Sequence, residues 1–426
     1  MPELAPVTTA RRIIDLPLPT RFELHFHGSA FETLASTARC EVTTRPKPGC
    51  RPEARLVAVT SPHQPDQPGN PAPATGSKVR LPLWDNARYL AITLVVIGHA
   101  ILRLIDASDT SYSVYLVIYA FHVPVFVLVS GYFAKSSPPG AKQLKRLVTD
   151  LVLPYLIFET IWTLVRWAVV GTLNLDLAQP SWTLWFILSL IAWRIALPYL
   201  AQLRYPLLIS IVVSVWAGYL GAITSEFAVS RTLGLLPFFV LGWRLRSSDL
   251  TRRWLSWSPS TVLWWRVGAV AVFAAVAVTA FTGIDFWRQI GVRRFLLFDE
   301  SYADMGYAEW WSGGVRLAVI GVAVILSFAF LVLVPRRRTV FTDLGQATLY
   351  IYLLHSFVLY PFRESGVLEG EVPFWYLPAM VVFAIIVTFV LASTPVRKLF
   401  RPLVEPHPRW LLRRVSAPVD ARTPGS

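Results

Sequence analysis

The sequence contains little charge and almost no cysteine for its length. Only 15% of its 426 residues are charged, while 54% are hydrophobic. This composition is typical of a protein that lies in lipid, and it argues against an ordinary set of soluble domains. Its two cysteines, Cys40 and Cys50, are too few for a disulfide framework or a thiol-rich metal site.

Residues 1–79 have no sustained hydrophobic periodicity and no apolar core of the kind found in secretory signals. They include the proline-rich stretch Ser61–Lys78, which cannot bury enough apolar surface to offset its ordering entropy. We expect 1–79 to be a disordered extension, and a translation start downstream of Met1 is one explanation for it. We expect a membrane domain at 80–401 and a disordered cytoplasmic tail at 402–426.

Apolar runs of the length needed to cross a bilayer as helix repeat from Leu81 to Pro395. They lie near 87–105, 112–133, 147–170, 182–200, 206–225, 230–246, 262–283, 312–334, 344–362 and 372–394. The pattern predicts an all-α polytopic membrane protein with about ten transmembrane helices.

The basic residues follow every second run, as expected for short cytoplasmic loops. They are Lys135, Lys142, Lys145, Arg146, Arg204, Arg244, Arg246, Arg252, Arg253, Arg336, Arg337, Arg338, Arg397, Lys398 and Arg401. The mixed charges of 284–311 obey the rule only loosely. Both termini are therefore predicted to be cytoplasmic. The net charge of +14 reflects topology and not a nucleic-acid partner, because no basic stripe with interleaved aromatics is present.

The first predicted span carries three polar residues with a functional spacing, Asp85, Arg88 and His99. Eleven residues of helix return to within about 20° of the same face and rise about 16 Å, so Arg88 and His99 share one stripe. Asp85 lies one turn before Arg88 and can orient its guanidinium. Arg88 would then lie at the cytoplasmic mouth, with His99 past the midplane.

This geometry suits a long donor whose phosphates stay at the mouth while its reactive end lies deep, as in coenzyme A thioesters. A neutral imidazole in a water-poor cavity is suited to act as a general base. His99 could also carry the acyl group briefly across the midplane, and the sequence does not separate these two roles. The structural alternative is a buried histidine that only bonds to a backbone carbonyl.

Two more histidines lie inside predicted spans, His122 in the second and His355 in the ninth. Both are candidates for lining a substrate cavity with His99, although His122 could equally be a packing residue beside Pro124. The three histidines lie on separate helices without i, i+4 spacing or paired carboxylates, so we expect no metal.

The basic residues Lys145 and Arg146, just before the third span, are candidate contacts for donor phosphates. Positive-inside topology alone would also explain them. Within that span, Glu159 and Arg166 share a face and could be structural partners or line the acceptor side.

Two further residues near the outer side are candidate acceptor contacts, Trp185 and Arg231. Trp185 opens the fourth span, where an interfacial aromatic belt is the alternative. Arg231 lies near the outer start of the sixth span.

These motifs resemble the acyltransferase-3 family of membrane acyltransferases. The resemblance rests on Asp85-x-x-Arg88 with Gly98-His99, and on Phe121–Phe126 with Ser130-Gly131-Tyr132. Leu153–Phe158, Leu184–Phe186 and Pro237–Gly242 are most similar to the fucose 4-O-acetylase-like branch.

The resemblance implies an O-acyltransferase, with ten membrane helices, in the bacterial plasma membrane. Its donor would be acyl-CoA, with acetyl as the expected acyl group. Its acceptor would be a saccharide of the envelope, an exopolysaccharide or a glycosylated metabolite. It implies that His99 is essential and that Arg88 supports it. One position departs from the family: where a second basic residue is expected a turn after Arg146, the chain has Asp150. A transporter or flippase for an envelope glycolipid is the alternative, although the halves show no convincing self-similarity.

Overall fold

The part of the chain that the structure describes is built from helices. The computed structural model describes residues 81–171, 173–221, 226–368 and 373–407, and these ranges contain no strand. The predicted all-α class is therefore confirmed for them. The predicted disorder of 1–79 lies outside the described residues, as do 408–426 of the predicted tail. The final helix runs to Val404, so residues 402–404 are helical.

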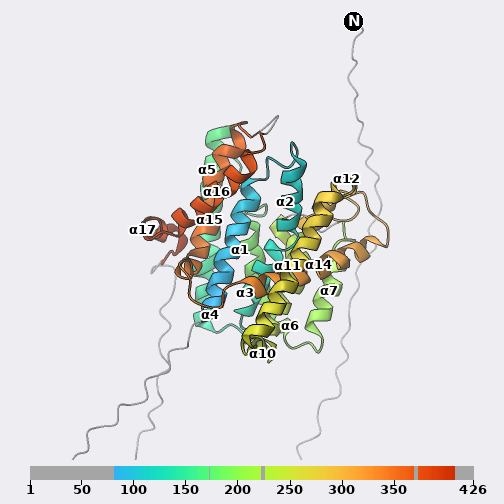
Figure 1. The fold of residues 1–426 in the computed structure, drawn as a ribbon. Helices are drawn as coiled ribbons and strands as arrows, with labels where there is room; N and C mark the ends of the chain where they lie inside the picture. Colours follow the sequence, from blue (N-terminus) through green and yellow to red (C-terminus); the bar gives the residue numbers. More distant parts are fainter. Residues whose placement is uncertain (1–80, 172, 222–225, 369–372, 408–426) are drawn as a thin grey trace, which may run out of the picture. The chain divides into compact units, whose positions relative to one another are not determined.

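The helices follow one another along the chain as Figure 1 shows. The first half contains α1 (Pro82–Ala100), α2 (Asp109–Tyr119), α3 (His122–Tyr132), α4 (Ala141–Leu147), the π-helical turn η1 (Val148–Val152), α5 (Leu153–Val170), α6 (Trp185–Leu200), α7 (Pro206–Ala217), the 3₁₀ turn η2 (Glu226–Ala228), α8 (Val229–Gly234) and α9 (Leu236–Ser247). The second half contains α10 (Leu250–Leu255), α11 (Pro259–Thr282), α12 (Ile284–Gln289), α13 (Val292–Leu297), α14 (Ser312–Leu333), the 3₁₀ turn η3 (Asp343–Ala347), α15 (Thr348–Glu364), α16 (Tyr376–Ala392) and α17 (Thr394–Val404).

All ten predicted spans contain helix, but fewer meet the length and hydropathy of a membrane span. Four helical stretches do so, namely Asp109–Tyr132, Ala141–Val170, Pro259–Thr282 and Ser312–Leu333. A fifth is added if α16 and α17, which are bent by 71°, are one broken span. The helices α6 and α7 are apolar but shorter. The described residues thus identify a membrane protein, whereas ten spans and cytoplasmic termini stay predictions.

The second predicted span is divided into α2 and α3. Phe121, between them, has φ −145° and ψ −18°, outside the helical region. Pro124 lies in the first turn of α3, where its missing N–H leaves no hydrogen bond unmade. His122 therefore begins a helix instead of lying within one.

The helices α3 and α9 cross at very short range because each has a glycine at the contact. A Cβ on Gly242 would lie 1.9 Å from the carbonyl oxygen of Leu128, and one on Gly131 would lie 2.0 Å from that of Phe239. Small residues of this kind let membrane helices approach closely. The glycines of both predicted motifs therefore serve helix packing.

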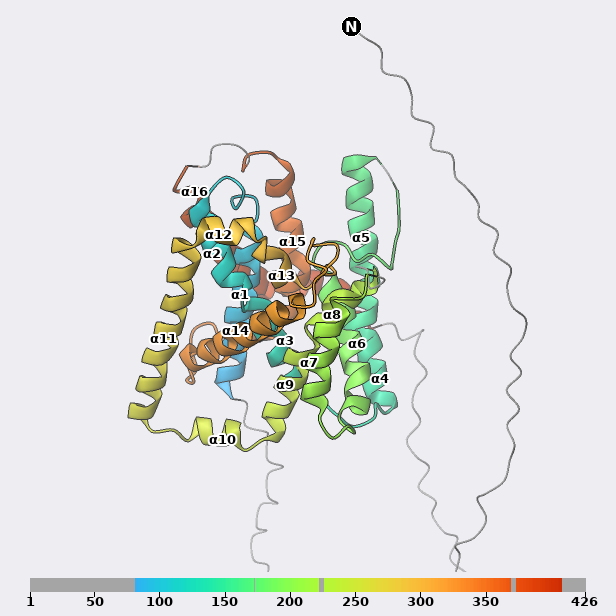
Figure 2. The same ribbon diagram turned by 90° about the vertical axis from the view of Figure 1, so that its right-hand side faces the viewer.

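The first helix, α1, is central to the packing and connects two ends of the helix assembly. It packs against α3, α15 and α16, so its end at His99 lies between the helices that carry His122 and His355. It begins at the end where α4 and α10 lie, and α12 lies at the opposite end (Figures 1 and 2). The basic α4 and α10 therefore share one end with Arg88.

Candidate active site

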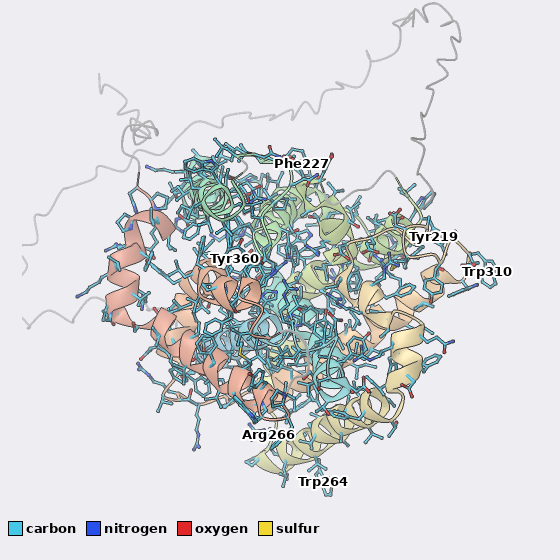
Figure 3. All side chains as sticks on the ribbon, turned by 90° about the horizontal axis from the view of Figure 1, so that it is seen from above. Tyr219, Phe227, Trp264, Arg266, Trp310 and Tyr360 are labelled. Atoms are coloured by element: carbon cyan, nitrogen blue, oxygen red, sulfur yellow. The ribbon has the colours of Figure 1, made fainter. Side chains whose placement is uncertain are left out.

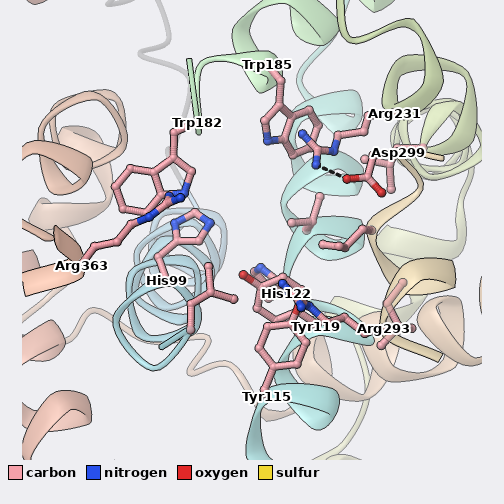
Figure 4. Close-up of a pocket in the computed structure, with 15 residues that line it drawn as sticks. His99, Tyr115, Tyr119, His122, Trp182, Trp185, Arg231, Arg293, Asp299 and Arg363 are labelled. Atoms are coloured by element: carbon pink, nitrogen blue, oxygen red, sulfur yellow. Dashed lines mark hydrogen bonds and ion pairs between the residues drawn. The ribbon is translucent and has the colours of Figure 1, made fainter. Parts of the chain in front are cut away.

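A cavity of about 260 Å³ lies at the C-terminal end of α1. Figure 4 shows that polar and aromatic side chains point into it from several helices. The lining residues are His99, Leu102, Tyr115, Tyr119, His122, Val123, Trp182, Trp185, Arg231, Leu235, Arg293, Leu296, Leu297, Asp299 and Arg363. Four of the residues named from sequence, His99, His122, Trp185 and Arg231, thus meet in one cavity.

The ring of His99 is held by His355, which is completely buried behind it. Nδ1 of His355 lies 2.7 Å from the carbonyl oxygen of Tyr352 and 3.0 Å from that of Ile351. Since a carbonyl only accepts, this nitrogen carries the proton, and Nε2 of a neutral His355 is an acceptor. Nδ1 of His99 lies 3.0 Å from that Nε2 and must therefore be the donor. These partners assign the lone pair of His99 to Nε2.

His122 has a comparable arrangement on the other side of the cavity. Its Nδ1 donates to the carbonyl oxygen of Ile118 at 2.9 Å, which leaves Nε2 as an acceptor. This Nε2 is buried and has no hydrogen-bond partner among the described residues. The ring lies edge-on to Tyr119, with centroids 4.4 Å apart. Two neutral imidazoles thus line one cavity.

Glu159 does not line the cavity, yet it fixes the segment that does. Its carboxylate is fully buried and accepts the backbone N–H of Ser181 at 2.8 Å and also the Ser181 hydroxyl. Next to this clamp, Trp182 has φ 39°, in the left-handed region that a bulky residue rarely adopts. Its ring lies 5.6 Å from that of His99. Arg166 is 3.5 Å from the same carboxylate, so the structural pairing considered from sequence is present.

Two arginines rest on the two tryptophans of the cavity. The guanidinium of Arg363 lies 5.0 Å from the ring centroid of Trp182, and that of Arg231 lies 4.9 Å from the centroid of Trp185. Arg231 also pairs with Asp299 at 2.5 Å, as Figure 4 shows. Trp182 and Trp185 are thus both walls of the cavity, and each has a guanidinium group beside its ring.

The sequence reading missed the wall that comes from residues 284–311. This segment, noted above only for its mixed charges, contains α12 and α13 and contributes Arg293 and Asp299 to the cavity. Tyr302 anchors it, since its backbone N–H bonds to Gly218 at 2.7 Å and its hydroxyl to Val215 at 3.0 Å. Burial raises the pKa of Tyr302 to about 12, so the hydroxyl stays a donor at neutral pH. The mixed charges of residues 284–311 were the signal in the sequence that could have indicated this wall.

The predicted donor contacts lie at the other end of α1 and do not line this cavity. Arg88 pairs with Asp85 at 3.7 Å and lies 4.0 Å from the ring centroid of Phe133. Lys145 and Arg146 are exposed on α4. About 16 Å of helix separates Arg88 from His99.

The unusual Asp150 has neighbours that moderate its charge. Its Oδ1 accepts the hydroxyl of Thr149 at 2.7 Å. Arg194, on α6, is close enough to interact with it electrostatically. A partner on another helix therefore accompanies this departure from the family pattern.

A membrane helix assembly with two neutral imidazoles in a cavity that also holds charged and aromatic side chains has the groups needed for transfer chemistry on a hydroxyl. A model of the acyltransferase domain family matches residues 82–393. The chain therefore belongs to this acyltransferase family and is an enzyme of that class. It is also similar to the nodulation protein NolL of Mesorhizobium japonicum, with 27% identity over 348 residues that cover 75% of this chain and 87% of NolL. No solved structure matches the chain.

Proposed function

We propose that the protein transfers a short acyl group, acetyl in the simplest case, from acyl-CoA to a hydroxyl of a saccharide, with His99 as general base. The observation that carries this proposal is the hydrogen bond from His99 to His355, which leaves Nε2 of His99 as an acceptor at the cavity. Because this hydrogen bond already leaves the lone pair on Nε2, His99 can act as a base without a change of tautomer. The plasma membrane of a bacterium is the proposed location.

The reaction moves the acyl group from a thioester, acyl-CoA, to a hydroxyl of the acceptor, which becomes an oxygen ester. Nε2 of His99 takes the proton of the acceptor hydroxyl, whose oxygen attacks the thioester carbonyl. The carbon–sulfur bond then breaks, and the imidazolium returns its proton to the departing thiolate. Arg231 and Arg363 supply positive charge near the developing oxyanion. The products are the O-acyl saccharide and free coenzyme A.

The two substrates would bind at opposite ends of α1. Arg88, oriented by Asp85, and the basic pair Lys145 and Arg146 would hold donor phosphates at the cytoplasmic end. The acceptor would occupy the cavity, where tryptophan rings present flat apolar faces to a sugar and His122 offers a second acceptor nitrogen. A volume of about 260 Å³ favours a single sugar ring with a short acyl group.

The proposal is tested by acyl transfer in membranes that contain the full chain. Labelled acetyl-CoA is supplied on the cytoplasmic side, and label is measured in envelope saccharides and in added glycolipid. We expect label in an alkali-labile O-ester that is absent from membranes without the protein. Uptake of the glycolipid without acylation would instead support the transporter alternative.

The role of the Glu159 clamp gives a separate prediction. Replacing Glu159 with alanine removes both acceptors of Ser181 and should let Trp182 leave its strained conformation. We expect KM for the acceptor to rise about tenfold, with a smaller change in kcat, because substrate positioning is lost. Steady-state acetyl transfer by the purified variant checks this. Arg166→Ala is the matched control, because that side chain is 43% exposed and contacts the same carboxylate. An unchanged KM in folded Glu159→Ala would contradict the positioning role.

A further inference from the structure

A second and larger cavity lies at the other end of the helix assembly. It has a volume of about 580 Å³ and is lined by residues of α9, α10, α11, α14 and the beginning of α1. Its walls are almost entirely aliphatic and aromatic, with Trp84, Trp254, Trp257 and Trp265 among the lining residues. An apolar cavity of this size suits a hydrocarbon chain.

Hydrogen-bond donors without partners gather on one side of this cavity. The indole Nε1 of Trp84 and that of Trp254 are buried and have no acceptor among the described residues. The same holds for Nε and Nη2 of Arg336, whose guanidinium lies 5.0 Å from the ring centroid of Trp254. Indole and guanidinium groups can only donate. Because buried polar groups are normally paired, these donors call for a ligand that brings acceptor oxygens.

The charge around these donors is positive. Arg266 lies close enough to Arg336 for the two guanidinium groups to repel each other. Within the described ranges, Arg266 donates to the backbone carbonyl of Val332 at 3.4 Å and to no other residue. An anion between Arg266 and Arg336 would relieve the repulsion and accept from the unpaired nitrogens.

The cavity adjoins the lipid-facing side of α11. This helix is long and apolar enough to span a membrane, yet only 6% of its most apolar window is buried inside the protein. Trp264 is 72% exposed and points outward, away from the other helices (Figure 3). A membrane lipid therefore needs only a lateral step to enter.

We propose that this cavity binds an anionic phospholipid from the cytoplasmic leaflet. One acyl chain occupies the apolar cavity, and the phosphate accepts from Arg336 and from the indoles of Trp84 and Trp254. The site does not depend on the proposed catalytic reaction. It gives the chain a preference for anionic over zwitterionic lipid.

Lipid retention by the purified full chain tests the site without reference to activity. The delipidated protein is given dioleoylphosphatidylglycerol or dioleoylphosphatidylcholine, and bound lipid is measured by native mass spectrometry. Both lipids carry the phosphate, but the choline cation of phosphatidylcholine would be repelled by Arg266 and Arg336, so we expect the anionic lipid to bind about tenfold more tightly. Equal binding of the two lipids would overturn the proposal.

Two pairs of variants test the site of the lipid acyl chain and the site of the lipid headgroup separately. Gly268→Leu fills the cavity and Gly321→Leu is its control, because open space surrounds the Cβ position at both glycines but only Gly268 lines the cavity. Arg336→Gln removes the charged group that carries the unpaired nitrogens. Its control is Arg252→Gln, because Arg252 is 87% exposed and pairs with Asp249 at 3.1 Å. We expect Gly268→Leu and Arg336→Gln each to lower retention of phosphatidylglycerol about tenfold and the controls to leave it unchanged. If Gly268→Leu retains as much phosphatidylglycerol as Gly321→Leu does, the cavity is not the site of the lipid acyl chain.

Discussion

Replacement of His99 with alanine is expected to lower kcat for acetyl transfer by about 10²–10⁴-fold, the usual contribution of a positioned general base. The reason is the direction of its lone pair. Nε2 of His355 accepts a hydrogen bond from Nδ1 of His99 at 3.0 Å, so Nε2 of His99 is the basic nitrogen, and His99 lines the cavity. Alanine removes this nitrogen and, as a good helix former, should leave α1 folded. Turnover of labelled acetyl-CoA by purified protein measures the loss.

A histidine outside the cavity provides the control for this experiment. His407 is exposed and contacts the backbone of Glu405 at 2.6 Å. We expect His407→Ala to keep full activity, and both variants should elute as folded protein in detergent. Retained activity in folded His99→Ala would show that His99 is a structural residue. His122→Ala then becomes the next variant to test, because its Nε2 also lines the cavity.

The sequence predicted the helices well because apolar runs and Pro or Gly punctuation act locally. All ten predicted runs contain helix, and the α3–α9 crossing uses the glycines Gly131 and Gly242 that stood out in two motifs. The cavity residues His99 and His122 were also found, since each is a polar residue inside an apolar run and such residues are costly in lipid. Local signals were sufficient for both.

Contacts between distant residues could not be derived in this way. His99 and His355 are 256 residues apart, and Glu159 and Ser181 are 22 apart. A single sequence identifies the type of each residue but not which helices become neighbours. The same limit explains why Arg293 and Arg363 were not predicted as cavity residues. Their positions in the cavity depend on how α13 packs against α2 and α14 and how α15 packs against α1.

The length of α1 raises a specific structural question about the donor. Arg88 and His99 lie about 16 Å apart along the helix. A phosphate held at Arg88 and a thioester at His99 would need an extended linker between them, which the pantetheine arm of coenzyme A provides. The small cavity at His99 then leaves room for the acyl group and the acceptor sugar and little else.

The second large effect is expected at His355, which acts through His99 and does not line the cavity. His355→Leu removes the acceptor of the His99 Nδ1 proton and leaves that donor unpaired. The proton can then move to Nε2, where the imidazole no longer acts as a base. We expect kcat to fall about 10- to 100-fold, in line with roughly 1–3 kcal/mol for a buried hydrogen bond. KM for the acceptor should change little, because the cavity walls are intact.

A conservative variant distinguishes this positioning role from simple packing. The side-chain oxygen of glutamine in His355→Gln can accept from Nδ1 of His99, so we expect activity well above that of His355→Leu at equal stability. Thermal unfolding in detergent and steady-state kinetics are measured for both variants. If glutamine restores nothing although the protein is folded, hydrogen bonding to His99 is not what His355 contributes. If leucine is as active as histidine, the tautomer of His99 does not depend on His355. The expected pattern, a fall in kcat that glutamine partly reverses at constant KM, follows only if the proton on Nδ1 keeps Nε2 available to the acceptor hydroxyl.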